Sequence, residues 1–68
     1  MEKQNTLGDR IRFARLVNRI TQKTLSESMG VSQTAVKNWE NNLNRPHPLR
    51  IPMLADVLGV TADELKGK

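Results

Sequence analysis

The chain has 68 residues and no cysteine, so we expect a single domain without disulfides, a structural metal or the zinc-finger ligand sets that need thiolates. No apolar run approaches the roughly 20 residues of a membrane span, and the polar N-terminus lacks the apolar segment of a secretory signal, so we expect a cytoplasmic protein. The net charge of +4 is concentrated in the first fifty residues, a distribution that favours a nucleic acid as partner over a membrane surface or an acidic protein.

Helical periodicity runs through the chain in short segments, and no stretch alternates apolar and polar residues as a strand does. The first helix is expected from Leu7 to about Asn18, with Thr6 as its N-cap. Ile11 and Ala14 follow Leu7 at helical spacing and mark its buried face. Further apolar side chains are expected to widen this buried arc, namely Phe13, Leu16, Val17 and Ile20.

The next two helices follow each other closely. The second is expected from Gln22 to Met29 behind the N-cap Thr21. Gly30 ends it, because glycine adopts the left-handed conformation without steric cost. The third is expected from Gln33 to about Glu40 behind the N-cap Ser32.

The turn between these helices is so short that they must cross steeply, as in a helix-turn-helix. In such a pair Val36 and Trp39 point into the core, and we expect Trp39 to be a core residue rather than a stacking platform. The third helix then presents a polar outer face made of Gln33, Thr34, Lys37 and Asn38.

Asparagines and prolines between Asn41 and Ile51 predict a loop. A fourth helix begins at Ile51, with Pro52 in its first turn, and stops at Gly59. The run Thr61-Ala62-Asp63-Glu64 is a capping box that opens a short fifth helix through Leu65. We expect residues 1–5 and 66–68 to be flexible ends of the single domain 1–68.

From Thr21 to Asn41 the sequence resembles the helix-turn-helix domains of lambdoid phage repressors and Cro proteins, and with its flanks the resemblance covers about residues 7–65. The match is carried by Gly30 at the turn and by apolar side chains at the family's core positions (Leu25, Met29, Val31, Val36 and Trp39). The departures are Ser26 in place of alanine, Asn42 in place of glycine, and a longer, proline-rich loop 43–51. We expect Asn42 to tolerate the left-handed conformation nearly as well as glycine. The resemblance implies an all-α, compact five-helix lambda-repressor-like domain.

The resemblance further implies a sequence-specific regulator of transcription, most simply a phage or bacterial repressor, that binds double-stranded DNA. The third helix would enter the major groove, where amide side chains can pair with adenine and a threonine methyl can contact thymine. The implied base-reading residues are Gln33, Thr34, Lys37 and Asn38. The competing interpretation is an ordinary solvated helix face, and Lys37 is equally compatible with a guanine, a phosphate or solvent.

Other roles follow from the same resemblance. Contacts to the DNA backbone are implied for Gln22, Ser32, Asn41, Asn44, Arg45 and Arg50, with His47 a weaker candidate than Arg50 for the minor groove. Arg15 and Glu40 would form a buried ion pair. A homodimer would assemble on a palindrome with half-sites about one helical turn (~34 Å) apart, and would be weak or monomeric without DNA. The implied dimer contacts are Pro48, Leu49, Val60, Ala62 and Glu64.

Two other classes of function compete with a DNA-binding regulator. An antitoxin of the same fold, which binds a toxin as well as its own operator, is the alternative hypothesis. An enzyme is not expected, because the sequence has no Ser/His/Asp pattern, no paired carboxylates and no glycine-rich phosphate loop. We expect no metal, no cofactor and no small-molecule substrate.

Overall fold

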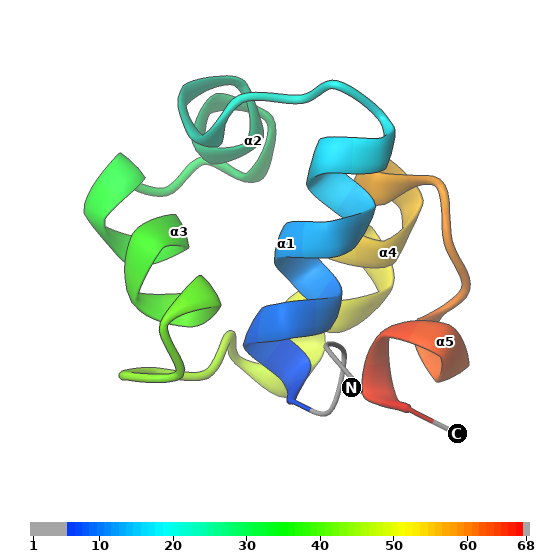
Figure 1. Ribbon diagram of the computed structural model, residues 1–68. Coiled ribbons are helices and arrows are strands. Elements are labelled where there is room, and N and C mark those ends of the chain that lie inside the picture. The colour runs from blue at the N-terminus through cyan, green and yellow to red at the C-terminus, as the bar shows by residue number, and fades with distance from the viewer. Residues whose placement is uncertain (1–5, 68) are drawn as a thin grey trace.

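Five α-helices and one short 3-10 helix make up the computed structural model over residues 6–67, the part of the chain that it describes (Figure 1). The expected helices are all present, and no strand occurs in residues 6–67. The elements, in chain order, are α1 (Leu7–Val17), α2 (Gln22–Met29), α3 (Gln33–Glu40), η1 (Pro48–Arg50), α4 (Ile51–Leu58) and α5 (Ala62–Lys66). The 3-10 helix η1, inside the expected loop, was not predicted.

Helix α1 runs through the middle of the molecule, with α2 and α3 on one side and α4 and α5 on the other (Figure 1). Local signals in the sequence set the starts of α1, α2, α3 and α5 and the ends of α2 and α4. The predicted N-caps each accept a hydrogen bond from a backbone N–H in the first turn (Thr6, Thr21, Ser32 and Thr61). Gly30 and Gly59 end α2 and α4 at φ of 70° and 72°, in the left-handed region.

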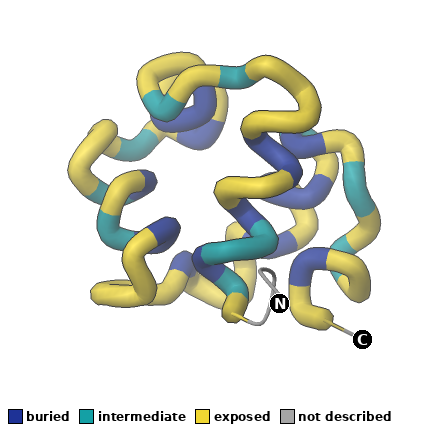
Figure 2. The backbone as a smooth tube through the Cα atoms, viewed as in Figure 1, coloured by how far each residue is buried: buried dark blue, intermediate teal, exposed yellow. Residues whose placement is uncertain are grey.

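The core lies where all these helices meet (Figure 2). Trp39 is 6% exposed and is a core residue, as predicted. Burying a large apolar side chain contributes roughly 1.5–3 kcal/mol relative to leaving it in water. The fully buried side chains are Ile11, Leu25, Val36, Leu54, Leu58 and Leu65.

One part of the core prediction is wrong. Phe13, Leu16 and Val17 do not widen the buried face of α1 and are 51%, 55% and 62% exposed. The buried face of α1 instead includes Arg15, which pairs with a carboxylate on α3. With about 100° of rotation per residue, a helix that buries Ile11 and Arg15 turns these three side chains outward.

The start of α1 rests directly on the end of α3. Asn42 follows α3 in the left-handed conformation, at φ 61°. Its side chain accepts a hydrogen bond from Gly8 N (3.1 Å) and donates one to Thr6 Oγ1 (3.0 Å). A Cβ atom at Gly8 would lie 2.5 Å from the carbonyl oxygen of Trp39 and 2.6 Å from that of Glu40. Glycine is therefore required here by close packing of two backbones.

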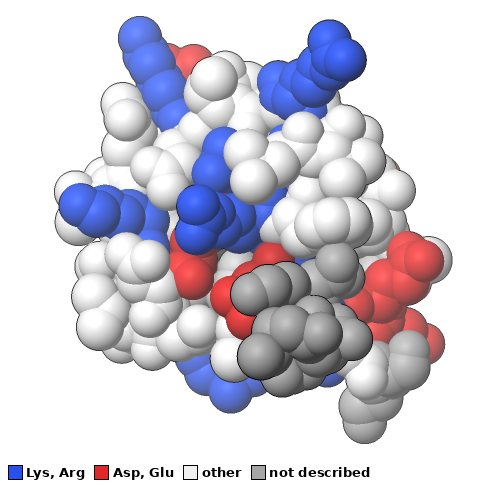
Figure 3. Space-filling model, in the orientation of Figure 1, with Lys and Arg blue, Asp and Glu red and all other residues white. Residues whose placement is uncertain are grey.

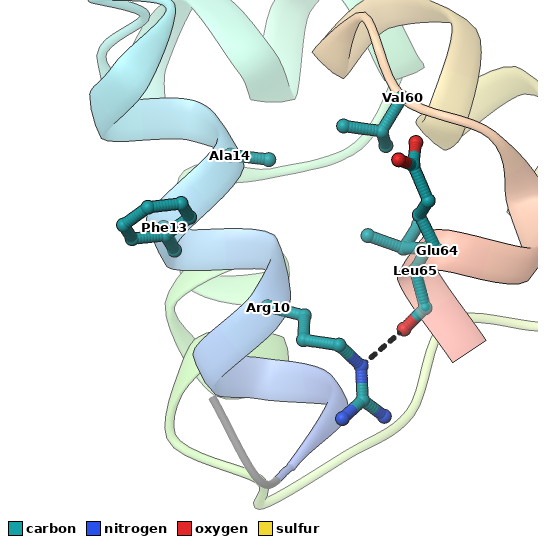
Figure 4. A pocket seen from close by; sticks show the side chains of 6 residues that line it. All are labelled: Arg10, Phe13, Ala14, Val60, Glu64 and Leu65. Carbon is teal, nitrogen blue, oxygen red and sulfur yellow. Dashed lines mark hydrogen bonds between the residues drawn. The ribbon is translucent and has the colours of Figure 1, made fainter. Parts of the chain in front are cut away.

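Polar side chains on α1 and at its C-cap also hold the C-terminal elements. Asn18 donates to the Leu58 carbonyl at the end of α4 (2.6 Å). Arg10 donates to the carbonyls of Leu65 (2.6 Å) and Lys66 (3.2 Å) at the end of α5 (Figure 4). Lys66 thus belongs to α5 and Gly67 caps it, whereas the expectations for residues 1–5 and 68 lie outside the described residues.

Candidate nucleic-acid interface

A buried ion pair fixes the frame of the helix-turn-helix. Arg15 on α1 donates to both carboxylate oxygens of Glu40 on α3, at 2.6 and 3.2 Å. The two side chains are only 11% and 4% exposed. Arg15 also donates to the carbonyl of Ile20 in the turn before α2 (2.9 Å). The pair implied by the resemblance is present, and it ties α1, the next turn and α3 together.

Gln22, the first residue of α2, belongs to the same network. Its Nε2 donates to Glu40 Oε1 at 3.1 Å, which fixes the side chain beside the start of α2. The first N–H groups of a helix have no intrahelical acceptor, and Thr21 Oγ1 satisfies that of Thr24. The N–H groups of Gln22 and Lys23 are the donors that this helix end can offer to an anion.

The departure from the family pattern at Ser26 is accommodated where α2 meets α3. Ser26 is 3% exposed, and its Oγ donates to the carbonyl of Lys23 at 2.7 Å. Among the residues that the structure describes, no buried side-chain nitrogen or oxygen lacks a partner. The described interior that supports the interface therefore has no unpaired polar side-chain atom.

The outer face of α3 carries the predicted base-reading side chains. Gln33, Thr34 and Lys37 are exposed, and Asn38 is half-buried. The opposite face buries Val36, Trp39 and Glu40. At 100° per residue, Thr34 lies at the middle of the outer face, Lys37 beside it, and Gln33 at the edge nearest α2. Ser32, the N-cap, is exposed and accepts from Ala35 N (3.1 Å).

A hollow of about 580 Å³ lies between the start of α2, the start of α3 and the end of α1. Gln22 and Gln33, two of the predicted contacts, share it with basic side chains that sequence reasoning did not select, Arg19 and Lys23. No acidic side chain is among its described lining residues. We name it the N-terminal hollow; it is lined by Arg15, Leu16, Arg19, Ile20, Thr21, Gln22, Lys23 and Gln33.

Arg19 and Lys23 were missed because their positions depend on tertiary structure. Arg19 adopts φ 57° in the turn after α1, and that turn brings it beside α2 and α3. The available signal was the cluster of basic residues close to Gln22 in the sequence. The cluster does not predict where the Arg19 side chain lies. Arg19 follows α1 in the left-handed conformation, so the helical periodicity of α1 does not extend to it.

The predicted backbone contacts after α3 lie at its other end. Asn41 is the exposed C-cap, and Asn44 is an exposed residue of the following turn. Arg45 is exposed and lines a hollow with Thr6, Leu7 and Asn42 beside the start of α1. The candidate contacts therefore flank α3 at both ends.

Arg50 and His47 lie apart from this arrangement. Arg50 Nη1 donates to the Met29 carbonyl at the C-terminal end of α2 (3.2 Å), whereas Gln22 lies at its N-terminal end. His47 Nδ1 accepts from Leu49 N (3.1 Å) and so caps η1. Both side chains have local structural partners, and a DNA contact for either stays a prediction.

The predicted dimer contacts occupy two places. Val60 and Glu64 line a hollow of about 320 Å³ between α1 and α5 (Figure 4), and Ala62 is the first residue of α5. Pro48 and Leu49 lie in η1, where Leu49 is 83% exposed. Glu64 also accepts from Thr61 N (2.8 Å) in the capping box, so it has a structural role.

Charge is unevenly distributed over the surface. Basic side chains are spread over the face shown in Figure 3, with smaller acidic areas beside them in its centre and at its top edge, and another acidic group lies on the side of α5. No helix within residues 6–67 is long and apolar enough to cross a membrane. The same residues contain no group of three or more His, Cys, Asp or Glu side chains placed to hold a metal.

Comparison with known proteins identifies relatives of this arrangement. A helix-turn-helix family model matches residues 11–65. Among solved structures, the P22 c2 repressor protein in complex with the synthetic operator 9T matches at a TM-score of 0.85 and 31% sequence identity. The match covers 91% of this chain and 94% of that chain. A search of curated proteins gives no match.

Proposed function

The chain belongs to the helix-turn-helix family of DNA-binding transcription regulators, and we propose that it is a repressor-type protein that reads a palindromic operator as a homodimer. The observation that carries this proposal is the exposed polar face of α3 beside a hollow lined by basic side chains. The similar P22 c2 repressor structure holds an operator, which supports double-stranded DNA as the partner.

The proposal assigns base reading to the first two turns of α3. Gln33 can accept from and donate to the major-groove edge of adenine, and the Thr34 methyl can contact a thymine methyl. Lys37 can reach guanine or a phosphate. Asn38 is half-buried and lies one turn after Thr34 on the same face of α3, where its amide could pair with a base.

Phosphate binding is assigned to both ends of α3. On one side the start of α2 lines the N-terminal hollow, where Arg19 and Lys23 add positive charge to the N–H groups of the helix end. On the other side Asn41, Asn44 and Arg45 follow α3. Contacts on two sides fix the position of α3 on the duplex, while the base edges provide the sequence information.

The salt dependence of DNA binding tests the phosphate contacts. The logarithm of the binding constant falls with the logarithm of salt concentration by about 0.9 for each phosphate neutralised. Lys23→Gln should therefore reduce this slope by about 0.9, with base preference unchanged. The measurement is fluorescence anisotropy of a labelled duplex over a series of salt concentrations.

Lys66→Gln is the matched control, because Lys66 is also exposed but lies on α5. It should leave the slope as in the unaltered chain. An unchanged slope in Lys23→Gln, or an equal loss in Lys66→Gln, would remove the N-terminal hollow from the DNA interface.

A further inference from the structure

The outer face of α1 carries a stripe of exposed apolar side chains. Phe13, Leu16 and Val17 are 51%, 55% and 62% exposed, and their i, i+3, i+4 spacing places them on one side of the helix. Single exposed apolar residues are ordinary, but a contiguous apolar patch marks an interaction surface. We call these three residues the outer stripe.

Arginines border the outer stripe. Arg12 on α1 and Arg19 in the following turn are exposed along one edge. Arg10 lies at the other edge and holds the end of α5. Asp9 lies one turn before Phe13, at the N-terminal end of the same face of α1. The surface is thus an apolar ridge with Arg12 and Arg19 along one edge and an aspartate at its N-terminal end.

The shape around the outer stripe suits a helix. Phe13 borders the hollow between α1 and α5, whose far side is formed by Val60, Glu64 and Leu65 (Figure 4). Leu16 borders the N-terminal hollow on the other side of α1. A ridge between two hollows allows the side chains of a second helix to pack on both sides.

The arginines beside the outer stripe disfavour a second copy of this chain as its occupant. Antiparallel pairing of two α1 helices through the outer stripe would bring Arg12 of one copy toward Arg19 of the other. Parallel pairing would set the Arg12 edge against the Arg10 edge. Like charges brought together at an interface suppress association, so both arrangements carry a repulsive contact between arginines.

We therefore infer that the outer stripe is a docking site for a different protein, through an amphipathic helix whose apolar stripe is flanked by aspartate and glutamate. Apolar side chains of that helix would cover Phe13, Leu16 and Val17, as in helix-in-groove recognition. Its carboxylates would face Arg12 and Arg19. Charge complementarity of this kind selects the partner and speeds its association.

The location of the site has a second consequence, which rests on the proposed function. Leu16 and Arg19 line the same hollow as Gln22 and Gln33. An acidic helix seated on the outer stripe would occupy one side of the DNA interface. The partner and DNA should then weaken each other's binding.

The probe for the docking site is a display library of helical peptides. Each peptide carries a fixed stripe of leucines, and its flanking positions vary among Glu, Gln and Lys. The library is selected on the intact protein and counter-selected on a Phe13→Gln/Val17→Gln variant, whose changes lie at exposed positions. We expect Glu to be enriched at the flanks, and the selected peptide to bind the variant at least tenfold more weakly.

Arg12→Glu is the charge control, and it should shift the selected flanks from Glu to Lys. Circular dichroism must show that both variants fold as the unaltered chain does. Absence of enrichment over the counter-selection, or enrichment without a charge preference, would overturn the docking site. A dimer that Phe13→Gln/Val17→Gln converts to a monomer in sedimentation would assign the stripe to a second copy and also overturn it.

Competition between the selected peptide and a labelled duplex separates the two claims. Displacement of the duplex supports the overlap of the two sites. Peptide binding without displacement would reject the overlap and leave the docking site in place. A chain that binds the peptide but no duplex at any salt concentration would contradict the proposed DNA-binding function alone.

Discussion

At the scale of single residues, the Arg15–Glu40 pair is best understood through the geometry it imposes. Removing two charges from water costs several kcal/mol each, and the attraction between them offsets that cost only with good hydrogen bonding. Here Glu40 accepts from both Arg15 and Gln22, and Arg15 also holds the Ile20 carbonyl. The pair fixes where α2 starts relative to α3, which is the spacing that a DNA duplex would meet.

For the substitution Gly8→Ala, close packing and helix propensity predict opposite changes in the free energy of unfolding. Alanine in place of a helical glycine usually stabilises a protein by about 0.5–1 kcal/mol. At Gly8 the added methyl would meet the carbonyl oxygens of Trp39 and Glu40. Gly8→Ala should instead lower the free energy of unfolding by about 2 kcal/mol, as overpacking does, in urea unfolding followed by circular dichroism.

Ser28→Ala is the control for this change, because Ser28 is an exposed residue of α2. It should be neutral or slightly stabilising, since alanine is the best helix former. Greater stability of Gly8→Ala than of the unaltered chain would contradict the close packing of α1 on α3.

Some residue-level features could be predicted from the sequence and others could not. Asn42 was expected to tolerate the left-handed conformation, and it does, because the short polar side chain makes that conformation accessible. Its hydrogen bonds to α1 were not predicted. The need for glycine at position 8 could not be predicted. Gly8 lies inside a helical pattern, and the backbone that leaves no room for a side chain there belongs to Trp39 and Glu40, far away in the sequence.

At the scale of elements, helix ends were predictable because they are local. Thr6, Thr21, Ser32 and Thr61 each satisfy an N–H three residues later, so a short stretch of sequence fixes each start. The rotation of α1 was not predictable from apolar spacing alone. Its apolar residues surround much of the helix, and the buried Arg15 decides which of them face the core.

Ser32 allows the stability of α3 to be separated from its contact with DNA. Ser32→Ala removes the N-cap and should lower the free energy of unfolding by about 1 kcal/mol. Ser32→Asp keeps a good N-cap, so its stability in the same urea experiment should be close to that of the unaltered chain. The added negative charge should nevertheless weaken duplex binding, most strongly at low salt.

The comparison of the two Ser32 variants decides whether the start of α3 faces DNA. If Ser32→Asp is as stable as the unaltered chain and binds a duplex as tightly, the N-terminal end of α3 lies away from the phosphates. The proposed docking of α3 would then be wrong.

At the scale of the whole molecule, a single copy presents only one α3 to DNA, so specificity depends on pairing. The predicted dimer contacts are few, and Val60 and Ala62 are partly buried within the chain itself. A stable interface buries about 800 Å² on each partner. We expect sedimentation to show a monomer at micromolar concentration and two chains per duplex on a palindrome. A tight dimer without DNA would contradict this assignment.

Selection from a library of random duplexes at physiological salt tests the central claim most directly. The account predicts enrichment of a pseudo-palindrome with half-sites about one helical turn apart. It also predicts that Gln33→Ala relaxes the preference at specific positions of each half-site while the remaining positions are retained. Salt-sensitive binding without any enriched sequence, or an identical preference in Gln33→Ala, would contradict operator reading by α3.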